Sequence, residues 1–215
     1  MGESHYKLCM VSAAGGPSNV SPAPLECHSI SLGSLGMKTL HSRIVYQNRW
    51  MTLREDAICR ADGSEGIFGV VEKPDAAMII PVENGRVNMV QQYKYAVGAR
   101  FWEFPQGTWE QAKDYSVEDL ARGELREETG LIARDLELLA RIYIAYGFLT
   151  QPMHVFVATG LTQLDAQPEH EEQDIVRGLF TWSEFHNMVA GGLITDAQTL
   201  AAFSLLRLKR PDLAV

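Results

Sequence analysis

The sequence has few cysteines and no concentration of positive charge. Its three cysteines, Cys9, Cys27 and Cys59, lack the short paired spacings of a disulfide framework or a zinc site. No run of Lys or Arg is present, and the formal net charge is −8. Because phosphate backbones are held by clustered basic side chains, we do not expect nucleic acid as a partner. The cysteine pattern favours a protein of the reducing cytoplasm.

Long apolar runs are also missing. The N-terminal patch "LCMVSAA" is shorter than the hydrophobic region of a signal peptide, and no later segment approaches the length of a membrane span. We therefore expect neither export nor membrane contact. The chain does have 215 residues with 46% hydrophobic and 21% charged composition, which is enough for one sizeable core with a small appendage.

The N-terminal segment differs in composition from the rest of the chain. Residues 1–36, including "SAAGGPSNVSPAP", are rich in Ser, Gly, Pro and Ala and show neither helical nor strand periodicity. We predict a disordered or tag-like extension, and Met37 would serve as a natural start.

From Arg43 onward the pattern is typical of short strands. The segments "RIVYQNRW", "MTLREDAIC" and "IFGVVEK" predict a small antiparallel unit within residues 37–75. Next, "AAMIIPV" and "RVNMVQQY" flank Asn84-Gly85, and Asn-Gly between two apolar runs is a strong hairpin signal. A main sheet is therefore expected to begin here, in a second unit of residues 76–215.

The second half of the chain continues with strands and then helices. The segments "LELLARIYIA", "MHVFVATGL" and "DIVRGLFTW" read as strands, and helices are expected at Ser183–Ala190 and Thr195–Lys209. This order predicts an α+β fold, in which helices cover a mixed sheet in a sandwich.

One helix between these strands carries an unusual concentration of negative charge. Ser116 and Asp119 form a capping-box start and Gly130 follows the last turn, so a helix is predicted from Val117 to about Thr129. Glu124, Glu127 and Glu128 then share one face. Since like charges at this spacing repel, either water screens the three carboxylates on an open face or a cation binds there.

The sequence around this helix resembles the Nudix box, G-x(5)-E-x(7)-R-E-U-x-E-E-x-G-U, where U is aliphatic. "ELREETGL", Glu124–Leu131, matches its second half without a gap, and "FWEFPQGTWE" precedes it. Together with the C-terminal "GGLITDAQTLAAFSLL", these segments resemble the ADP-ribose and nucleoside-diphosphate-sugar pyrophosphatase branch of that family. The resemblance implies a Nudix-type α/β/α sandwich with a small N-terminal antiparallel strand unit that exchanges between the subunits of a homodimer.

The same resemblance implies the metal ligands. They would be Glu124, Glu127, Glu128 and the backbone carbonyl of Gln106, and we count Glu128 among the catalytic residues as well. Carboxylate oxygens without nearby Cys or His suit Mg²⁺ or Mn²⁺ better than zinc. Metal ions of this kind can bridge a pyrophosphate and activate a water molecule.

The match is incomplete in the first half of the box. The interval from Gly107 to Glu124 is longer than in the family pattern, Tyr115 stands where the family has its first glutamate, and Gly123 stands where it has arginine. Either the scaffold compensates elsewhere or catalysis is weakened. Because the three glutamates most directly tied to metal are present, we expect an active enzyme.

The expected reaction is metal-dependent hydrolysis of a nucleoside diphosphate sugar such as ADP-ribose into two monophosphates. There are two alternatives. The first is a dinucleoside-polyphosphate or nucleotide hydrolase, because Tyr146 and the "FPQG" segment resemble the residues found at these places in dinucleoside-polyphosphate hydrolases. The second is a non-catalytic regulator that binds nucleotide sugars. Tyr146 would stack on a base or fill the wall of a sheet. Arg100 and Glu103 would contact a phosphate or a sugar hydroxyl, or pair with each other at the surface.

The general base is expected in the acidic segment "QPEHEEQDI". In the resembling branch a glutamate beyond the box takes the proton of the attacking water, and Glu172, with Glu171 second, best matches its distance from the next strand. The alternative is that this segment is a solvated acidic loop. His154, within an apolar strand, is expected to be a hydrogen-bonded structural residue, and Trp102 and Trp109 are expected in the core or at the rim.

Overall fold

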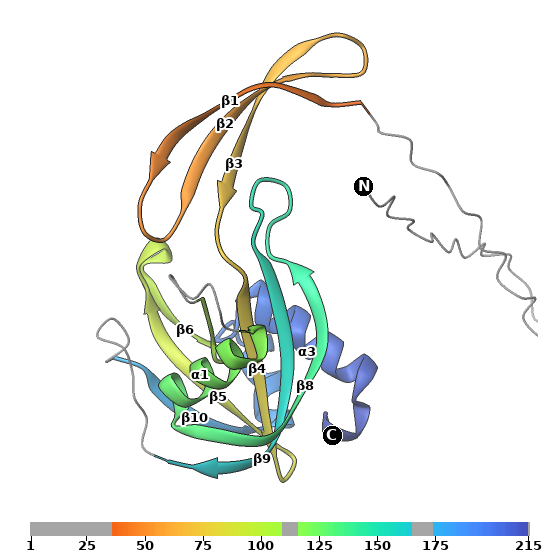
Figure 1. Ribbon diagram of the computed structural model, residues 1–215. Helices are drawn as coiled ribbons and strands as arrows, with labels where there is room; N and C mark the ends of the chain where they lie inside the picture. Colours follow the sequence, from red (N-terminus) through yellow and green to blue (C-terminus); the bar gives the residue numbers. More distant parts are fainter. Residues whose placement is uncertain (1–35, 109–115, 165–173, 215) are drawn as a thin grey trace, which may run out of the picture. The chain divides into compact units, whose positions relative to one another are not determined.

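The computed structural model describes residues 36–108, 116–164 and 174–214 (Figure 1). The described chain divides into two compact units, residues 36–42 with 56–68 and residues 43–55 with 69–214. The N-terminal extension expected over residues 1–36 lies outside the described residues, except for Gly36.

The first three strands form a sheet of their own. They are β1 (Lys38–Gln47), β2 (Thr52–Cys59) and β3 (Glu65–Glu72), in the order β1-β2-β3. The turn after β1 is closed by Asn48, whose Oδ1 accepts hydrogen bonds of 2.9 Å from the backbone N–H groups of Trp50 and Met51. The prediction of three strands is confirmed, but β1 begins at Lys38 rather than Arg43 and ends before Trp50.

The second sheet is mixed, as predicted. Its central order is β10-β5-β4-β9-β8, with β6 paired to β5 and β7 paired to β4. β4 and β9 run parallel, whereas the pairs β10–β5, β4–β5, β4–β7, β5–β6 and β8–β9 are antiparallel. The strands are β4 (Ala76–Glu83), β5 (Arg86–Lys94), β6 (Ala99–Glu103), β7 (Gln106–Gly107), β8 (Leu131–Tyr143), β9 (Pro152–Gln163) and β10 (Val176–Thr181).

The hairpin between β4 and β5 forms where the sequence predicts it. Asn84 and Gly85 both have positive φ, 51° and 69°, as a two-residue turn between right-twisted strands requires. The strands β6 and β7, by contrast, were not predicted, nor was the short 3-10 helix η1 (Tyr95–Val97) that precedes them.

Helices cover both faces of the mixed sheet. β4 is buried from Ala76 to Val82, and its alternate residues face opposite sides. Ala77 and Ile79 pack in a cluster with α1 (Val117–Thr129). Met78 and Ile80 belong to a larger cluster with α2 (Trp182–Ala190) and α3 (Ala197–Lys209). The predicted α+β sandwich is thus confirmed, and α3 is followed by the 3-10 helix η3 (Pro211–Leu213).

None of the helices in the described ranges combines the length and apolar character needed to cross a membrane.

Candidate active site

Local signals define the glutamate helix α1. The Oγ of Ser116 accepts a hydrogen bond of 3.1 Å from the N–H of Asp119, and Asp119 Oδ2 accepts one of 3.0 Å from the N–H of Ser116. The Ser116 hydroxyl also donates to Asp119 Oδ2 at 2.6 Å, and this bond, together with the one from the Ser116 N–H, lowers the pKa of Asp119. At the other end Gly130 has φ 70° and its N–H donates to Arg126 O at 2.8 Å. The predicted helix is therefore confirmed from its first to its last residue.

The acidic face of α1 is not a solvated surface. Glu124 and Glu128 are only 4% and 3% exposed, and Leu120 and Leu125 of the same helix are buried as well. Glu127 is partly exposed. The interpretation that water screens these charges on an open face is therefore wrong for Glu124 and Glu128. Burying a carboxylate is costly unless hydrogen bonds or a cation compensate for the lost water.

The segment of residues 104–107, which we call the lead-in segment, runs against this buried face. It connects β6 to β7 and so passes from the neighbourhood of β5 to that of β4. Pro105 O accepts a hydrogen bond of 2.9 Å from the N–H of Ile79. The N–H of Gln106 donates to Glu128 Oε2 at 3.1 Å. Two of the expected metal-site residues, Gln106 and Glu128, are therefore in direct contact.

Gly107, the last residue of the lead-in segment, lies against another expected metal ligand, Glu124. A Cβ atom on Gly107 would lie 2.5 Å from Cδ of Glu124, which is closer than any real Cβ contact. A glycine is thus required for the Glu124 carboxylate to lie against the backbone. The longer interval between Gly107 and Glu124 in the sequence does not separate these two residues in space.

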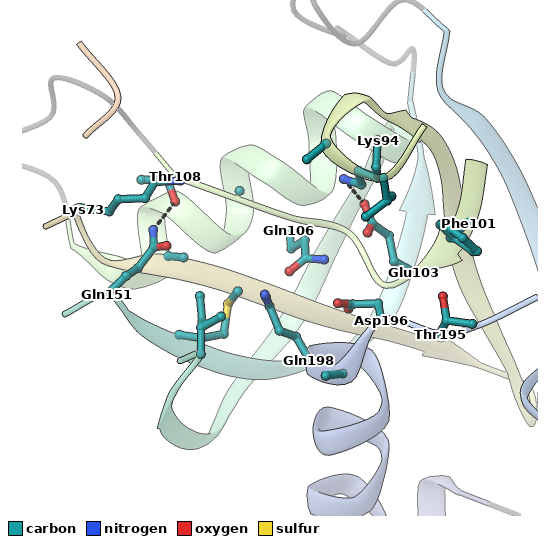
Figure 2. A pocket seen from close by; sticks show the side chains of 17 residues that line it. Lys73, Lys94, Phe101, Glu103, Gln106, Thr108, Gln151, Thr195, Asp196 and Gln198 are labelled. Carbon is teal, nitrogen blue, oxygen red and sulfur yellow. Dashed lines mark hydrogen bonds and ion pairs between the residues drawn. The ribbon is translucent and has the colours of Figure 1, made fainter. Parts of the chain in front are cut away.

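Beside the lead-in segment lies a cavity of about 580 Å³ (Figure 2). This volume is within the range of small-molecule sites. Its wall includes Gln106 and Gly107 of the lead-in segment, and the N-terminal end of α3 contributes Asp196 and Gln198. The other lining residues are Lys73, Ala76, Lys94, Ala96, Val97, Phe101, Glu103, Thr108, Ile144, Gln151, Met153, Thr195 and Ala197.

Glu103, which the sequence suggests as a substrate contact, lies in the wall of this cavity. It is 3% exposed, and its Oε1 forms an ion pair of 2.5 Å with Nζ of Lys94. Burial raises the pKa of Glu103, and the charge of Lys94 opposes this rise without cancelling it.

Arg100 and Glu103 do not pair with each other, so that alternative was wrong. Arg100 forms an ion pair with Asp174 and donates from Nη2 to Gln91 O at 2.9 Å. Glu103 instead pairs with Lys94. Arg100 is not among the residues that line the cavity.

Other sequence expectations have mixed outcomes. Tyr146 is 86% exposed, so the interpretation that it fills the wall of a sheet was wrong. His154 Nε2 lies 2.8 Å from Asp75 Oδ2, whereas its buried Nδ1 has no hydrogen-bond partner among the described residues. Trp102 packs edge-on against Phe180 in the core.

The expected bases Glu171 and Glu172, together with Trp109 and Tyr115, lie outside the described residues.

Two buried polar residues next to the site were not predicted from the sequence. Gln151 is 4% exposed, and its Nε2 donates to Pro74 O at 2.7 Å and to Thr108 Oγ1 at 3.0 Å. Thr199 is fully buried in α3 and contacts Phe104. Asp196 before "AQTLAAF" is a helix-start signal, but no local pattern reveals that either residue reaches a segment so distant in the sequence.

Comparison with known proteins identifies the class to which this fold and site belong. A model of the NUDIX domain matches residues 72–203, so the chain belongs to the Nudix family of hydrolases. A second model, described as the nucleoside diphosphate sugar hydrolase N-terminal domain, matches residues 37–71. The resemblance read from the glutamate helix is confirmed.

Individual relatives agree with this assignment. The chain is 33% identical over 171 residues to an "ADP-ribose pyrophosphatase" of Mycobacterium tuberculosis, covering 78% of this chain and 79% of the relative. It is 28% identical to an "ADP-ribose pyrophosphatase" of Bacillus subtilis, covering 82% and 95%. A crystal structure of an ADP compounds hydrolase has a TM-score of 0.75 at 20% identity, with 85% of this chain and 100% of that chain covered.

Proposed function

We propose that the protein hydrolyses the pyrophosphate bond of nucleoside diphosphate sugars such as ADP-ribose, giving two monophosphates. The observation that carries the proposal is the contact of the buried carboxylates of Glu124 and Glu128 with Gly107 and Gln106, beside a cavity of small-molecule size. Two relatives that share most of their length with this chain are named ADP-ribose pyrophosphatase, which supports the choice of substrate.

The residues at this contact fit a hard divalent cation, Mg²⁺ or Mn²⁺. Glu124 and Glu128 are buried carboxylates of one helix face, and backbone of the lead-in segment lies against both. In the described ranges no three His, Cys, Asp or Glu side chains are placed to hold one metal ion together. Mg²⁺ commonly takes one or two protein carboxylates and completes its shell with water and substrate phosphates. Glu124, Glu128 and the Gln106 carbonyl would therefore hold it, and we retain Glu127 as a further ligand chosen from the sequence.

When bound, the cation would neutralise charge on the pyrophosphate and lower the pKa of a water molecule. The chain itself positions the donors, because the Gln106 N–H fixes Glu128 and Gly107 leaves room for Glu124. Glu103 and Lys94 present a carboxylate and an ammonium group to the substrate from the cavity wall. For the general base we retain the sequence-based choice of Glu172, with Glu171 second.

A direct assay tests this function. Purified protein is incubated with ADP-ribose and MgCl₂, and AMP and ribose 5-phosphate are quantified by chromatography. Reaction in H₂¹⁸O shows which phosphorus the water attacks. Release of both monophosphates, lost in EDTA and restored by excess Mg²⁺, is the expected result.

The assay also separates the alternatives. A parallel panel contains dinucleoside polyphosphates and nucleoside triphosphates. Turnover of these compounds alone would favour the dinucleoside-polyphosphate or nucleotide hydrolase, and the exposed ring of Tyr146 would then be the first base contact to test. Binding of ADP-ribose without turnover of any compound would instead indicate a regulator.

The oligomeric state and the compartment belong to the same proposal. We expect a homodimer that associates through β1, because all ten residues of this strand are exposed, including Leu40, Ile44 and Tyr46. We place the protein in a reducing cytoplasm, in agreement with the free thiol of Cys59.

A further inference from the structure

The lead-in segment has one buried backbone donor that no strand satisfies. The pairing of β6 with β5 ends at Glu103, and the pairing of β7 with β4 involves Gln106 and Gly107. Between them Pro105 has no N–H, so Phe104 provides the single N–H group of the crossing. Phe104 is fully buried, which makes an acceptor for this group necessary.

Thr199 supplies that acceptor from the C-terminal helix, 95 residues away in the sequence. Its Oγ1 accepts a hydrogen bond of 3.2 Å from the Phe104 N–H. The same hydroxyl donates to Asp196 Oδ2 at 2.8 Å. Since a threonine hydroxyl has one proton, its donation to Asp196 leaves a lone pair for Phe104. Asp196 is held in turn by the Thr199 N–H at 2.8 Å, as the N-cap of α3.

Three different elements therefore fix the lead-in segment. α3 holds Phe104 through Thr199, β4 holds Pro105 through Ile79, and α1 holds Gln106 through Glu128. The next residue, Gly107, lies against Glu124. If Phe104 lost its partner, the segment would be free to shift at one end while α1 stayed in place.

We propose that Thr199 is a positioning residue, which through Phe104 sets where the lead-in segment lies against the carboxylates of Glu124 and Glu128. Thr199 is not among the residues that line the cavity, and its hydroxyl accepts from the Phe104 N–H and donates to Asp196, the N-cap of α3. The inference rests on the proposed function for its kinetic consequence, whereas its structural part is independent of any activity. Misplacement of a donor by even about 1 Å can cost about a hundredfold in rate.

The test compares Thr199→Val, which keeps the shape but removes the hydroxyl, with Thr199→Ser, which keeps the hydroxyl but removes a buried methyl group. Ser204→Ala is the matched control, because it removes from the same helix an exposed hydroxyl that donates to Leu200 O. Three readouts are used: hydrogen–deuterium exchange over residues 102–108, Mn²⁺ binding by the loss of the free-ion EPR signal, and kcat and KM with ADP-ribose.

Thr199→Val is expected to speed exchange over residues 102–108, weaken Mn²⁺ binding about 10-fold or more, and lower kcat with little change in KM. Thr199→Ser should stay within about threefold of wild type in all three readouts, even where its melting temperature is lower, and Ser204→Ala should match wild type. The proposal is overturned if Thr199→Val keeps wild-type exchange and Mn²⁺ affinity, or if Thr199→Ser is impaired as strongly as Thr199→Val. A wild-type protein inactive on every substrate would refute the proposed function, while exchange and Mn²⁺ binding would still decide the role of Thr199.

Discussion

At Gly107 the backbone of the lead-in segment and a carboxylate of α1 occupy neighbouring positions with no room for a side chain. A Cβ atom there would meet Cδ and Oε2 of Glu124, both at 2.5 Å. These atoms lie at the end of a flexible side chain, so the fold can yield at small cost while the carboxylate must move. A change at this position therefore separates the geometry of the site from the stability of the protein.

We predict that Gly107→Ala lowers kcat with ADP-ribose by about 10²-fold and leaves the melting temperature nearly unchanged. The reason is that the new methyl group displaces Glu124 from the backbone without disturbing the core. Steady-state kinetics and thermal denaturation provide the measurement. Gly147→Ala is the matched control, because a Cβ at Gly147 meets nothing within 4 Å. Wild-type turnover by Gly107→Ala would show that the position of Glu124 does not matter for catalysis.

The buried carboxyl group of Glu103 is expected to make the stability of the protein depend on pH. Burial raises its pKa above the ordinary value of 4.5, and Lys94 opposes the rise. A carboxyl group whose pKa is higher in the folded state favours the folded protein below the unfolded pKa, and this contribution is lost as the pH rises through the folded pKa. The glutamine amide does not titrate, so the difference between Glu103→Gln and wild type reports this effect.

We predict that the melting temperature of Glu103→Gln rises relative to wild type as the pH is raised from about 4 toward 8. Denaturation scans at several pH values measure the difference between the two proteins. In Lys94→Met the stabilising charge is removed, so this variant should lose stability over the same range more steeply than wild type. A difference between Glu103→Gln and wild type that shrinks with rising pH would mean that Lys94 outweighs burial.

At the scale of elements, α1 has the clearest local determinants. The capping box of Ser116 and Asp119 and the left-handed Gly130 fix both of its ends. Gly123 works against them, because glycine inside a helix costs about 1 kcal/mol relative to alanine. Gly123 is absent from the glycines with positive φ, so its backbone conformation is open to other residues. Its helix is nevertheless formed, since Leu120 and Leu125 are buried against the sheet.

We predict that Gly123→Ala raises the free energy of unfolding by roughly 1 kcal/mol, through helix propensity. Gly123→Arg should add a few tenths of a kcal/mol if the new side chain pairs with Glu127 four residues later. Chemical denaturation of both variants against wild type measures the two terms separately. A lower stability of Gly123→Ala would show that the glycine is needed for close packing, and that its departure from the family pattern is not a simple loss.

Some strands could be predicted from the sequence and others could not. The hairpin at Asn84-Gly85 was predictable because its turn chemistry is local. The strands β6 and β7 were not predicted, because their formation depends on pairing with β5 and β4 rather than on an alternation of their own. The early start of β1 was missed for the same reason, since the residues before Arg43 become a strand by joining a sheet.

At the scale of the whole molecule, the proposed homodimer would associate through the exposed strand β1. Leu40, Ile44 and Tyr46 lie an even number of positions apart along the strand, so their side chains share one face. Each of them is at least half exposed. A row of exposed apolar side chains on an edge strand is prone to pair with another chain. A charge placed in this row should therefore oppose association without affecting the core.

We predict that the wild-type protein elutes with the mass of two chains in size-exclusion chromatography with light scattering, and that Ile44→Glu elutes with the mass of one. His41→Glu, on the opposite face of the same strand, should remain dimeric. Circular dichroism checks that both variants fold. A wild-type protein that is monomeric at every concentration would contradict the homodimer.

The sequence alone determined the class of the fold, the ends of α1, the hairpin at Asn84-Gly85 and the Nudix resemblance. These features depend on capping residues, turn residues and spacings within a short stretch of chain, so they can be read without knowledge of distant contacts. The glutamates of α1 could be named for the same reason, because helical spacing puts them on one face.

The tertiary structure alone decided which side chains meet across the fold. It buried Glu124 and Glu128, paired Glu103 with Lys94 rather than with Arg100, and brought Thr199 to Phe104. Long-range packing moves residues tens of positions apart into contact, and no local pattern encodes the partner. A threonine in the middle of a helix has the same appearance in the sequence whether it faces water or a buried backbone N–H, and only the folded chain distinguishes the two.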